Sequence, residues 1–167
     1  MLKYCKDKWA ENEDKLREAI SKTDRNIRRE WTYADLVILV VENILNPGMQ
    51  PKYLRHKGFL TSAGSPWQTN VGEVDDGDYQ GTLIFVIHMN SYQPNSDEYM
   101  FTYVEYGSCS GCDTLQGIQS EDIYDEENQK EIDGSVMYDY MTLCKHLVDN
   151  FKHPFESNFV NFEEAKA

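Results

Sequence analysis

The chain has 167 residues, of which 40% are hydrophobic and 13% aromatic, and its net charge is −13 at pH 7. This length is typical of one domain and is sufficient to bury a core without disulfide or metal support. The acidic balance repels phosphate backbones, so we expect no direct nucleic-acid binding. No apolar run reaches the roughly 18 residues that span a bilayer, and the N-terminus lacks a signal-peptide hydrophobic region. We therefore expect no membrane association and a cytoplasmic location.

The charge is distributed unevenly along the chain. Residues 1–60 carry 12 Lys or Arg against 9 Asp or Glu, whereas residues 61–167 carry 4 against 20. The first part is therefore +3 and the second −16. Such asymmetry indicates a partner surface on one side of the molecule. The simpler alternative is that the acidity only keeps the protein soluble.

Two helices are predicted in the N-terminal part. Apolar residues recur at steps of three or four over residues 2–22, which is typical of an amphipathic helix. Residues 23–30 are predicted to be a polar connection or a helix extension. Thr32 followed by Asp35 resembles a capping box, and the apolar run over residues 36–45 indicates a buried helix.

An antiparallel hairpin is predicted in the middle of the chain. Residues 82–89 are apolar on both faces, which is typical of a central strand, and residues 99–106 are rich in Tyr and Phe. An acidic turn is predicted over residues 74–81, before the first of these strands. Residues 46–70 are predicted to form a long loop with a short strand at 58–61.

The C-terminal part is predicted to be mainly helical. A short helix runs to Ile118, and residues 121–133 form a solvated acidic loop or short helix. Ser135 is predicted to cap a last helix, whose apolar face comprises Val136, Met137, Tyr140, Met141, Cys144, Leu147, Val148 and Phe151. These elements predict a single α+β domain over residues 1–167. Its antiparallel sheet is built round a central hairpin and packs against two N-terminal helices and one C-terminal helix.

Cys109 and Cys112 form the one chemically distinctive motif. They follow a predicted strand and precede a predicted helix, whose positive end lowers the pKa of a thiol. Such a pair serves redox chemistry, binds a metal, or forms a structural turn in which Gly107 and Gly111 adopt positive φ. The structural turn is favoured, because the intervening pair is Ser-Gly and no βαβ pattern precedes the motif.

No cofactor, metal site or catalytic residue is predicted. Zinc needs about four ligands, and Cys144 and His146, two residues apart on a helix, point in different directions. The acidic cluster at Asp75, Asp76 and Asp78 lacks the spacing and the closing Glu of an EF-hand loop. The sequence contains no nucleophile motif and no Gly-rich phosphate loop. A non-enzymatic protein is therefore favoured.

Two segments carry a family resemblance. Residues 77–82 (GDYQGT) and 106–116 (YGSCSGCDTLQ) resemble a pattern in small bacteriophage-encoded proteins. The resemblance covers about a quarter of the chain, and the family carries no known activity. It implies a phage or prophage origin and a role inside a bacterial cell.

Three functional hypotheses follow from these observations. The first is an acidic binding protein, a phage-encoded inhibitor of a host protein with a basic groove that binds nucleic acid. Its predicted contact residues are Glu73, Asp75, Asp76, Asp78, Glu121, Asp122, Asp125, Glu126 and Glu127. The second is a thiol redox protein or sensor that acts through Cys109 and Cys112. The third is a small structural or scaffold component of a phage.

Overall fold

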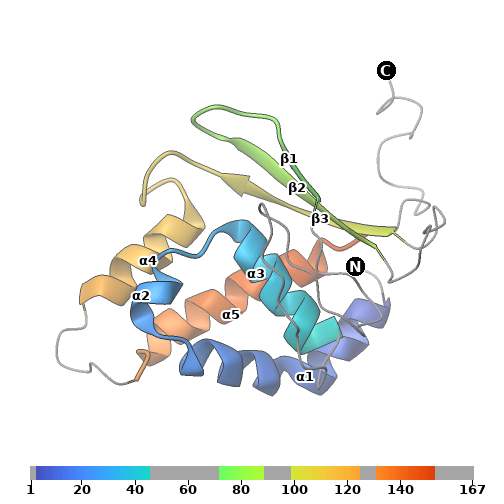
Figure 1. Cartoon of the computed structure of the whole chain (residues 1–167), viewed down its shortest axis with the longest axis horizontal. Coiled ribbons are helices and arrows are strands. Elements are labelled where there is room, and N and C mark those ends of the chain that lie inside the picture. Colours follow the sequence, from blue (N-terminus) through green and yellow to red (C-terminus); the bar gives the residue numbers. More distant parts are fainter. Residues whose placement is uncertain (1–2, 46–71, 89–98, 125–130, 153–167) are drawn as a thin grey trace.

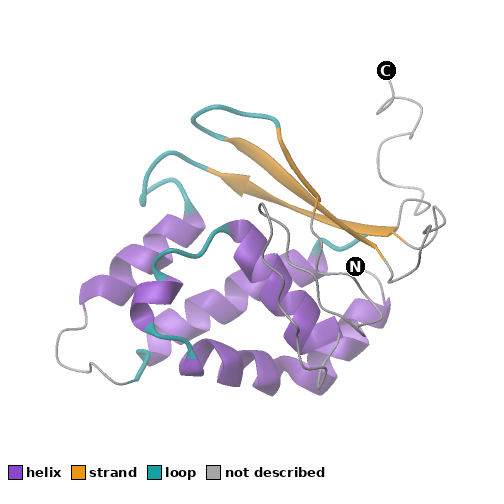
Figure 2. Ribbon diagram, in the orientation of Figure 1, coloured by secondary structure: helices purple, strands orange, loops and turns teal. Residues whose placement is uncertain are grey.

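A three-stranded antiparallel sheet lies on a layer of helices (Figures 1 and 2). This computed structural model describes residues 3–45, 72–88, 99–124 and 131–152. Within these ranges, three helices and a π-helical turn precede the sheet, and two helices follow it. The α+β class and the packing of the sheet against N-terminal and C-terminal helices are confirmed. The strand predicted at residues 58–61 lies outside the described residues.

Helix α1 (Lys3–Lys22) buries one stripe of side chains, as its periodicity predicts. The buried residues are Cys5, Trp9, Asn12, Leu16 and Ile20. The polar member of this stripe is satisfied, because the Asn12 amide donates to the carbonyls of Lys8 at 3.1 Å and Ile44 at 3.2 Å. The second bond fixes α1 against the segment that follows α3.

Helices α2 (Arg25–Arg28) and α3 (Tyr33–Val40) follow in close succession. The capping box predicted for α3 is confirmed: the Thr32 hydroxyl accepts the Asp35 N–H, and the Asp35 carboxylate accepts the Thr32 N–H. The chain then continues as a π-helical turn, η1 (Val41–Leu45). The predicted burial is also confirmed, because the buried side chains of α3 and η1 are Tyr33, Leu36, Val37, Ile38, Val40, Val41, Ile44 and Leu45.

The sheet consists of β1 (Gly72–Asp75), β2 (Gly81–His88) and β3 (Tyr99–Tyr106), in that order. Both neighbouring pairs are antiparallel. The hairpin and the central position of β2 are thus confirmed. The assignment of Val74 and Asp75 to a turn is wrong, because both pair with β2. A four-residue strand with one Gly and two acids has low intrinsic β propensity, so its pairing with β2 determines its conformation.

Alternate strand residues face the helices and form part of the core. The buried ones are Phe85, Ile87, Met100, Thr102 and Val104. The Thr102 hydroxyl donates to the Leu147 carbonyl at 2.6 Å, which ties β3 to α5 (Gly134–Asp149). Just beyond α5, Lys152 pairs with Phe101 through two backbone hydrogen bonds. The chain just after α5 therefore covers part of the edge of β3.

The two C-terminal helices differ in detail from their predictions. Helix α4 (Thr114–Tyr124) runs past Ile118 and includes the first residues of the predicted acidic loop. The cap of α5 is Asp133 and not Ser135, because the Asp133 carboxylate accepts the Ser135 N–H at 2.8 Å. The apolar face predicted for α5 is buried in full.

A buried ion pair joins α2 to α4. The Arg28 guanidinium donates to both carboxylate oxygens of Asp122, at 2.9 and 3.0 Å, and both side chains are 5% exposed. Such bidentate pairs are geometrically specific and strong. Asp122 is among the predicted contact residues, but its carboxylate is enclosed by this pair. We therefore remove it from the predicted surface.

Replacing Asp122 with Ala should destabilise the protein by about 3–5 kcal/mol, because the Arg28 guanidinium then stays buried without a counter-charge. Urea unfolding followed by circular dichroism measures this loss. The exposed neighbour provides the control, since Glu121→Ala should change stability by less than about 0.5 kcal/mol. The double change Arg28→Met with Asp122→Leu should restore most of the loss. A loss below about 1 kcal/mol for Asp122→Ala would contradict the assigned role.

Candidate functional site

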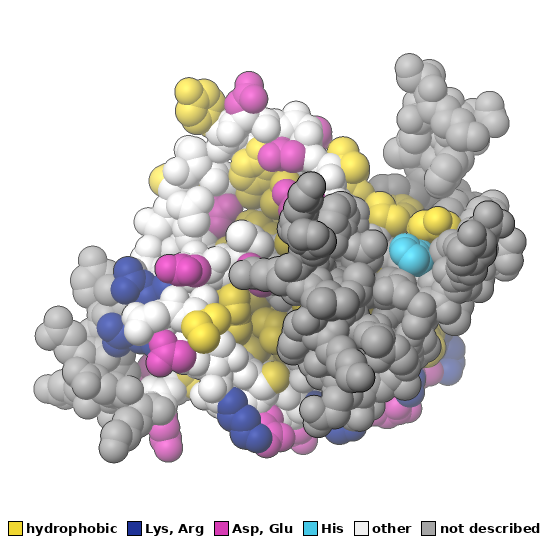
Figure 3. All heavy atoms as spheres, viewed as in Figure 1, with side chains coloured by type: hydrophobic (Ala, Val, Ile, Leu, Met, Phe, Trp, Pro, Cys, Tyr) yellow, Lys and Arg dark blue, Asp and Glu magenta, His cyan; other side chains and the backbone are white. Residues whose placement is uncertain are grey.

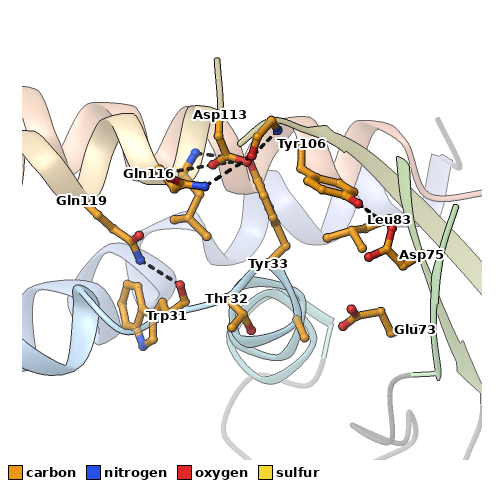
Figure 4. Close-up of a pocket in the computed structure, with 13 residues that line it drawn as sticks. Trp31, Thr32, Tyr33, Glu73, Asp75, Leu83, Tyr106, Asp113, Gln116 and Gln119 are labelled. Atoms are coloured by element: carbon orange, nitrogen blue, oxygen red, sulfur yellow. Dashed lines mark hydrogen bonds between the residues drawn. The ribbon is translucent and has the colours of Figure 1, made fainter. Parts of the chain in front are cut away.

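A cleft of about 330 Å³ lies between the edge of the sheet and the N-terminal ends of α3 and α4 (Figure 4). One wall comes from β1, and the other from the segment that leads into α3 together with α4. We call it the acidic cleft. The residues that give it its chemical character are Trp31, Tyr33, Glu73, Asp75, Tyr106 and Asp113.

Strand pairing explains why two carboxylates face this cleft. Glu73 lies opposite Phe85 and Asp75 lies opposite Leu83, and both of these apolar residues pack on the core. Side chains alternate along a strand, so Glu73 and Asp75 share the face that points toward the helices. Figure 4 shows both side chains directed from β1 into the cleft. Both residues remain exposed, because β1 is the edge strand.

Asp113 is buried at one end of the acidic cleft, and both of its carboxylate oxygens accept hydrogen bonds. Oδ2 accepts the Gly107 N–H at 3.1 Å, and Oδ1 accepts the Gln116 N–H at 2.8 Å and the Tyr33 hydroxyl at 3.3 Å. Asp113 therefore caps the N-terminus of α4. The Tyr33 hydroxyl in turn accepts the Leu115 N–H at 3.2 Å. This carboxylate joins β3, α3 and α4.

Asp75 and Tyr106 form a hydrogen-bonded pair across the sheet. Asp75 Oδ1 accepts the Gly77 N–H at 3.0 Å and the Tyr106 hydroxyl at 2.7 Å. Both bonds lower the pKa of Asp75, and the bond from the Gly77 amide has the larger effect. The bond to the carboxylate raises the pKa of Tyr106 to about 12. At neutral pH Asp75 is therefore charged and Tyr106 is neutral. Within the described residues, no side chain forms a hydrogen bond or ion pair with Glu73.

The turn between β1 and β2 extends the acidic surface. Asp76 fixes this turn, because its carboxylate accepts the Thr82 N–H at 2.6 Å. A Cβ on Gly81 would lie 2.9 Å from the backbone N and Cα of Gly77, so the turn requires glycine there. Asp78 is exposed on the turn. In the described part of the chain, no Lys or Arg pairs with Asp76 or Asp78.

The basic side chains lie elsewhere. Figure 3 shows acidic side chains both at the sheet end of the visible face and over the helices, whereas the Lys and Arg side chains on that face lie over the helices. Three lysines of α1 pair along their own helix: Lys3 with Asp7, Lys8 with Glu11 and Lys22 with Glu18. The amphipathic N-terminal helix therefore does not neutralise the acidic cleft.

The predicted contact residues occupy different places. The structure brings together Glu73, Asp75, Asp76 and Asp78 at one end of the sheet. Glu121 is exposed but lines a separate groove between α4 and α5, along with Asp139 and His146. Three further predicted residues, Asp125, Glu126 and Glu127, lie outside the described residues.

The sequence does not single out the aromatic residues of the cleft, and it does not place Asp113 beside them. Trp31 and Tyr33 flank the Thr32 cap, Tyr106 ends β3, and Asp113 directly follows Cys112. Each lies at the end of an element or in a connection between elements, where functional side chains are common. Their position at element ends is therefore a sequence signal for a functional role, but the sequence does not show that these segments lie together in the fold.

Residues 107–113, which we call the dithiol turn, connect β3 to α4. The N–H groups of Cys112 and Asp113 both donate to the Cys109 carbonyl, at 2.9 and 2.8 Å. The two thiols are free and exposed, with their sulfurs 2.7 Å apart. The Cys109 N–H also donates to Cys112 Sγ at 3.0 Å. Hydrogen bonding by the Cys109 thiol is the main cause that lowers the pKa of Cys112.

The predicted role of two glycines in this turn is wrong. Neither Gly107 nor Gly111 has φ in the left-handed region. Gly107 is instead required by close approach, because a Cβ there would lie 2.4 Å from the Cys112 carbonyl oxygen and 2.8 Å from its sulfur. Gly111 faces open space. The turn is thus packed closely on one side and open on the other.

The structure separates the ligands considered for zinc. Cys144 is fully buried, and burial raises the pKa of its thiol to about 12. His146 lies on the exposed side of α5, next to Asn150. In the part of the chain described, no three His, Cys, Asp or Glu side chains gather closely enough to hold a metal ion.

Comparison with protein-family models, curated protein sequences and solved structures gives no match to this chain. None of the helices in the described segments is long and apolar enough to cross a membrane. The acidic cleft and the dithiol turn are therefore the features of this chain that indicate a function.

Replacing Asp75 with Asn should lower the pKa of Tyr106 from about 12 toward its ordinary value near 10, because the charged acceptor is lost. NMR titration of ¹³C-labelled tyrosine rings measures this pKa, and Tyr106→Phe assigns the signal. A raised pKa means that the hydrogen bond stabilises the fold below about pH 10 and that this contribution disappears as the pH rises through about 12. Asp7→Asn, on α1, is the control and should leave the titration unchanged. An unchanged Tyr106 pKa in the Asp75→Asn variant would show that the Asp75 carboxylate does not cause the raised pKa.

Proposed function

We propose that this protein is a non-enzymatic binding protein whose acidic cleft holds a basic side chain of a partner protein. The observation that carries this proposal is the composition of the cleft. Two exposed carboxylates, Glu73 and Asp75, enter a space with aromatic walls, and the described residues that line it include no Lys, Arg or His. A negative, partly enclosed site without a counter-charge attracts a cation.

Arginine is the side chain that fits this site best. Glu73 and Asp75 lie two positions apart on one strand face, which separates them by roughly 7 Å. A planar guanidinium donates to carboxylates in pairs and stacks on aromatic rings such as those of Trp31 and Tyr106. A volume of about 330 Å³ is at the lower end of ligand sites. It therefore suits one or two side chains and not a large cofactor.

The residues of the acidic cleft are poorly suited to act as catalytic nucleophiles or bases. The Thr32 hydroxyl is bonded within the capping box. Burial raises the pKa of Tyr33 to about 12, and the pKa of Tyr106 is equally high, so neither is a base at neutral pH. Both oxygens of Asp113 are occupied by the hydrogen bonds that hold α4 in place. Binding is thus favoured over an enzymatic role.

As the partner we propose a bacterial host protein with a basic groove, which this chain would block as a phage-encoded inhibitor. Complementary potential accelerates and orients such docking, and the carboxylates of Asp76 and Asp78 extend the negative surface beyond the cleft. The resemblance to phage-encoded proteins supports this proposal. Its second segment, residues 106–116, contributes Tyr106, Gly107, Asp113, Leu115 and Gln116 to the lining of the cleft.

Fluorescence anisotropy with a labelled nine-residue arginine peptide tests the proposal. The double change Glu73→Gln with Asp75→Asn should weaken binding at least about tenfold, because two charge-assisted contacts are lost. A nine-residue lysine peptide should bind more weakly than the arginine peptide, since it cannot form paired contacts. Binding should weaken as salt rises.

The matched control removes the same charge from a different surface. Asp7→Asn with Glu11→Gln changes two exposed carboxylates of α1, and it should alter the affinity by less than about twofold. An equal loss in both double variants would show that only the net charge attracts the peptide. That result, or no binding by the unaltered protein, would reject the acidic cleft as the site.

A further inference from the structure

We propose that Cys109 and Cys112 form a reversible disulfide by exchange with a low-molecular-weight disulfide of the glutathione class. This would give the protein a second chemically active site, on the dithiol turn. The inference stands apart from the proposed function, because it concerns the chemistry of two thiols and requires no ligand in the acidic cleft.

The geometry of the dithiol turn places the two sulfurs for bond formation. They are 2.7 Å apart, and a disulfide needs about 2.05 Å, so an approach of less than about 1 Å is sufficient. The backbone holds both residues in one hydrogen-bonded turn, because the Cys112 N–H donates to the Cys109 carbonyl. The close contact between Gly107 and Cys112 further limits the movement of this segment.

Accessibility distinguishes this pair from the other cysteines. Both Cys109 and Cys112 are exposed, whereas Cys5 and Cys144 are 0% exposed. A small disulfide can therefore reach the dithiol turn but not the two core thiols. Reaction should be confined to one pair of the four cysteines.

Cys112 is the attacking thiol. Its sulfur accepts a hydrogen bond from the Cys109 N–H at 3.0 Å and faces the Cys109 thiol, and both contacts stabilise a thiolate. Its lowered pKa agrees with this assignment. The hydroxyl of Ser108 lies 4.0 Å from the same sulfur. Cys109 is then the resolving thiol.

The reaction balances in two exchange steps. The Cys112 thiolate attacks one sulfur of oxidised glutathione, which forms a mixed disulfide at Cys112 and releases one glutathione thiolate. Cys109 loses its proton and attacks Cys112 Sγ, which forms the Cys109–Cys112 bond and releases the second glutathione. Two protein thiols are oxidised, one glutathione disulfide is reduced to two thiols, and excess reduced glutathione reverses both steps.

Metal binding is the less supported use of the same pair. A structural zinc ion takes four ligands, and two cysteines supply only half of them. Among the residues that the structure describes, no third His, Cys, Asp or Glu joins Cys109 and Cys112. Disulfide formation needs no further ligand.

Glutathione titration of the full-length protein tests the inference. The reduced protein is equilibrated anaerobically with buffers of varied ratio of oxidised to reduced glutathione, then acid-quenched, alkylated and mapped by mass spectrometry. We expect one disulfide, between Cys109 and Cys112, whose fraction follows the glutathione ratio from either direction. Failure of this disulfide to form in excess oxidised glutathione would overturn the inference.

Single variants test the assigned order of attack. Cys109→Ser should accumulate a glutathione adduct at Cys112, because the resolving thiol is gone. Cys112→Ser should form the corresponding adduct at Cys109 about fivefold more slowly, since, within the described residues, a backbone N–H donates to the Cys112 sulfur but none donates to the Cys109 sulfur. Circular dichroism should show that both exposed-site variants remain folded. A faster adduct at Cys109 than at Cys112 would reject Cys112 as the attacking thiol.

Discussion

The buried carboxylate of Asp113 is the constraint on which the functional end of this molecule depends. It accepts the Gly107 N–H, the first amide after β3, caps α4 and accepts the Tyr33 hydroxyl of α3. A buried carboxylate is costly unless such donors satisfy it, so the three elements must meet at this point. The acidic cleft opens on one side of Asp113, which is also the last residue of the dithiol turn. The two candidate sites therefore share Gly107 and Asp113, and a change in the turn would reach the wall of the cleft.

The second constraint is the edge position of β1. Pairing with β2 fixes which face Glu73 occupies, and strand alternation turns its carboxylate toward the helices. A carboxylate facing a core is normally neutralised, and Arg28 does this for Asp122. No described cation does so for Glu73 or Asp75. Among the described residues, the fold thus holds negative charge beside aromatic rings at the edge strand of the sheet, and this is where we propose that a guanidinium from another molecule binds.

The sequence predicts the elements whose cause is local. The Thr32 capping box and the α5 stripe are formed by residues three or four positions apart, so their patterns are visible in the chain. Strand β1 is not predictable in this way, because its conformation comes from pairing with β2. The burial of Asp122 in an ion pair is equally unpredictable from the sequence, since its partner Arg28 is 94 residues away in the chain.

The candidate site likewise has one part that the sequence predicts and one part that it does not. The acidic residues 73–78 stand out in the sequence as a charge cluster, and Cys109 and Cys112 as a motif. The convergence of Trp31, Tyr33 and Tyr106 on that cluster is a tertiary effect, which one sequence does not encode as a pattern. The extent of a single domain over residues 1–167 stays a prediction.

The most direct test of the central claim is an NMR titration of the ¹⁵N-labelled protein with N-acetyl-arginine amide. If the acidic cleft holds a guanidinium, saturable shifts should appear at the Trp31 indole N–H and at the backbone amides of residues 73–77. The lysine analogue should cause smaller shifts at the same positions. Shifts scattered over the acidic residues of α1, with the Trp31 signal unmoved, would contradict the account.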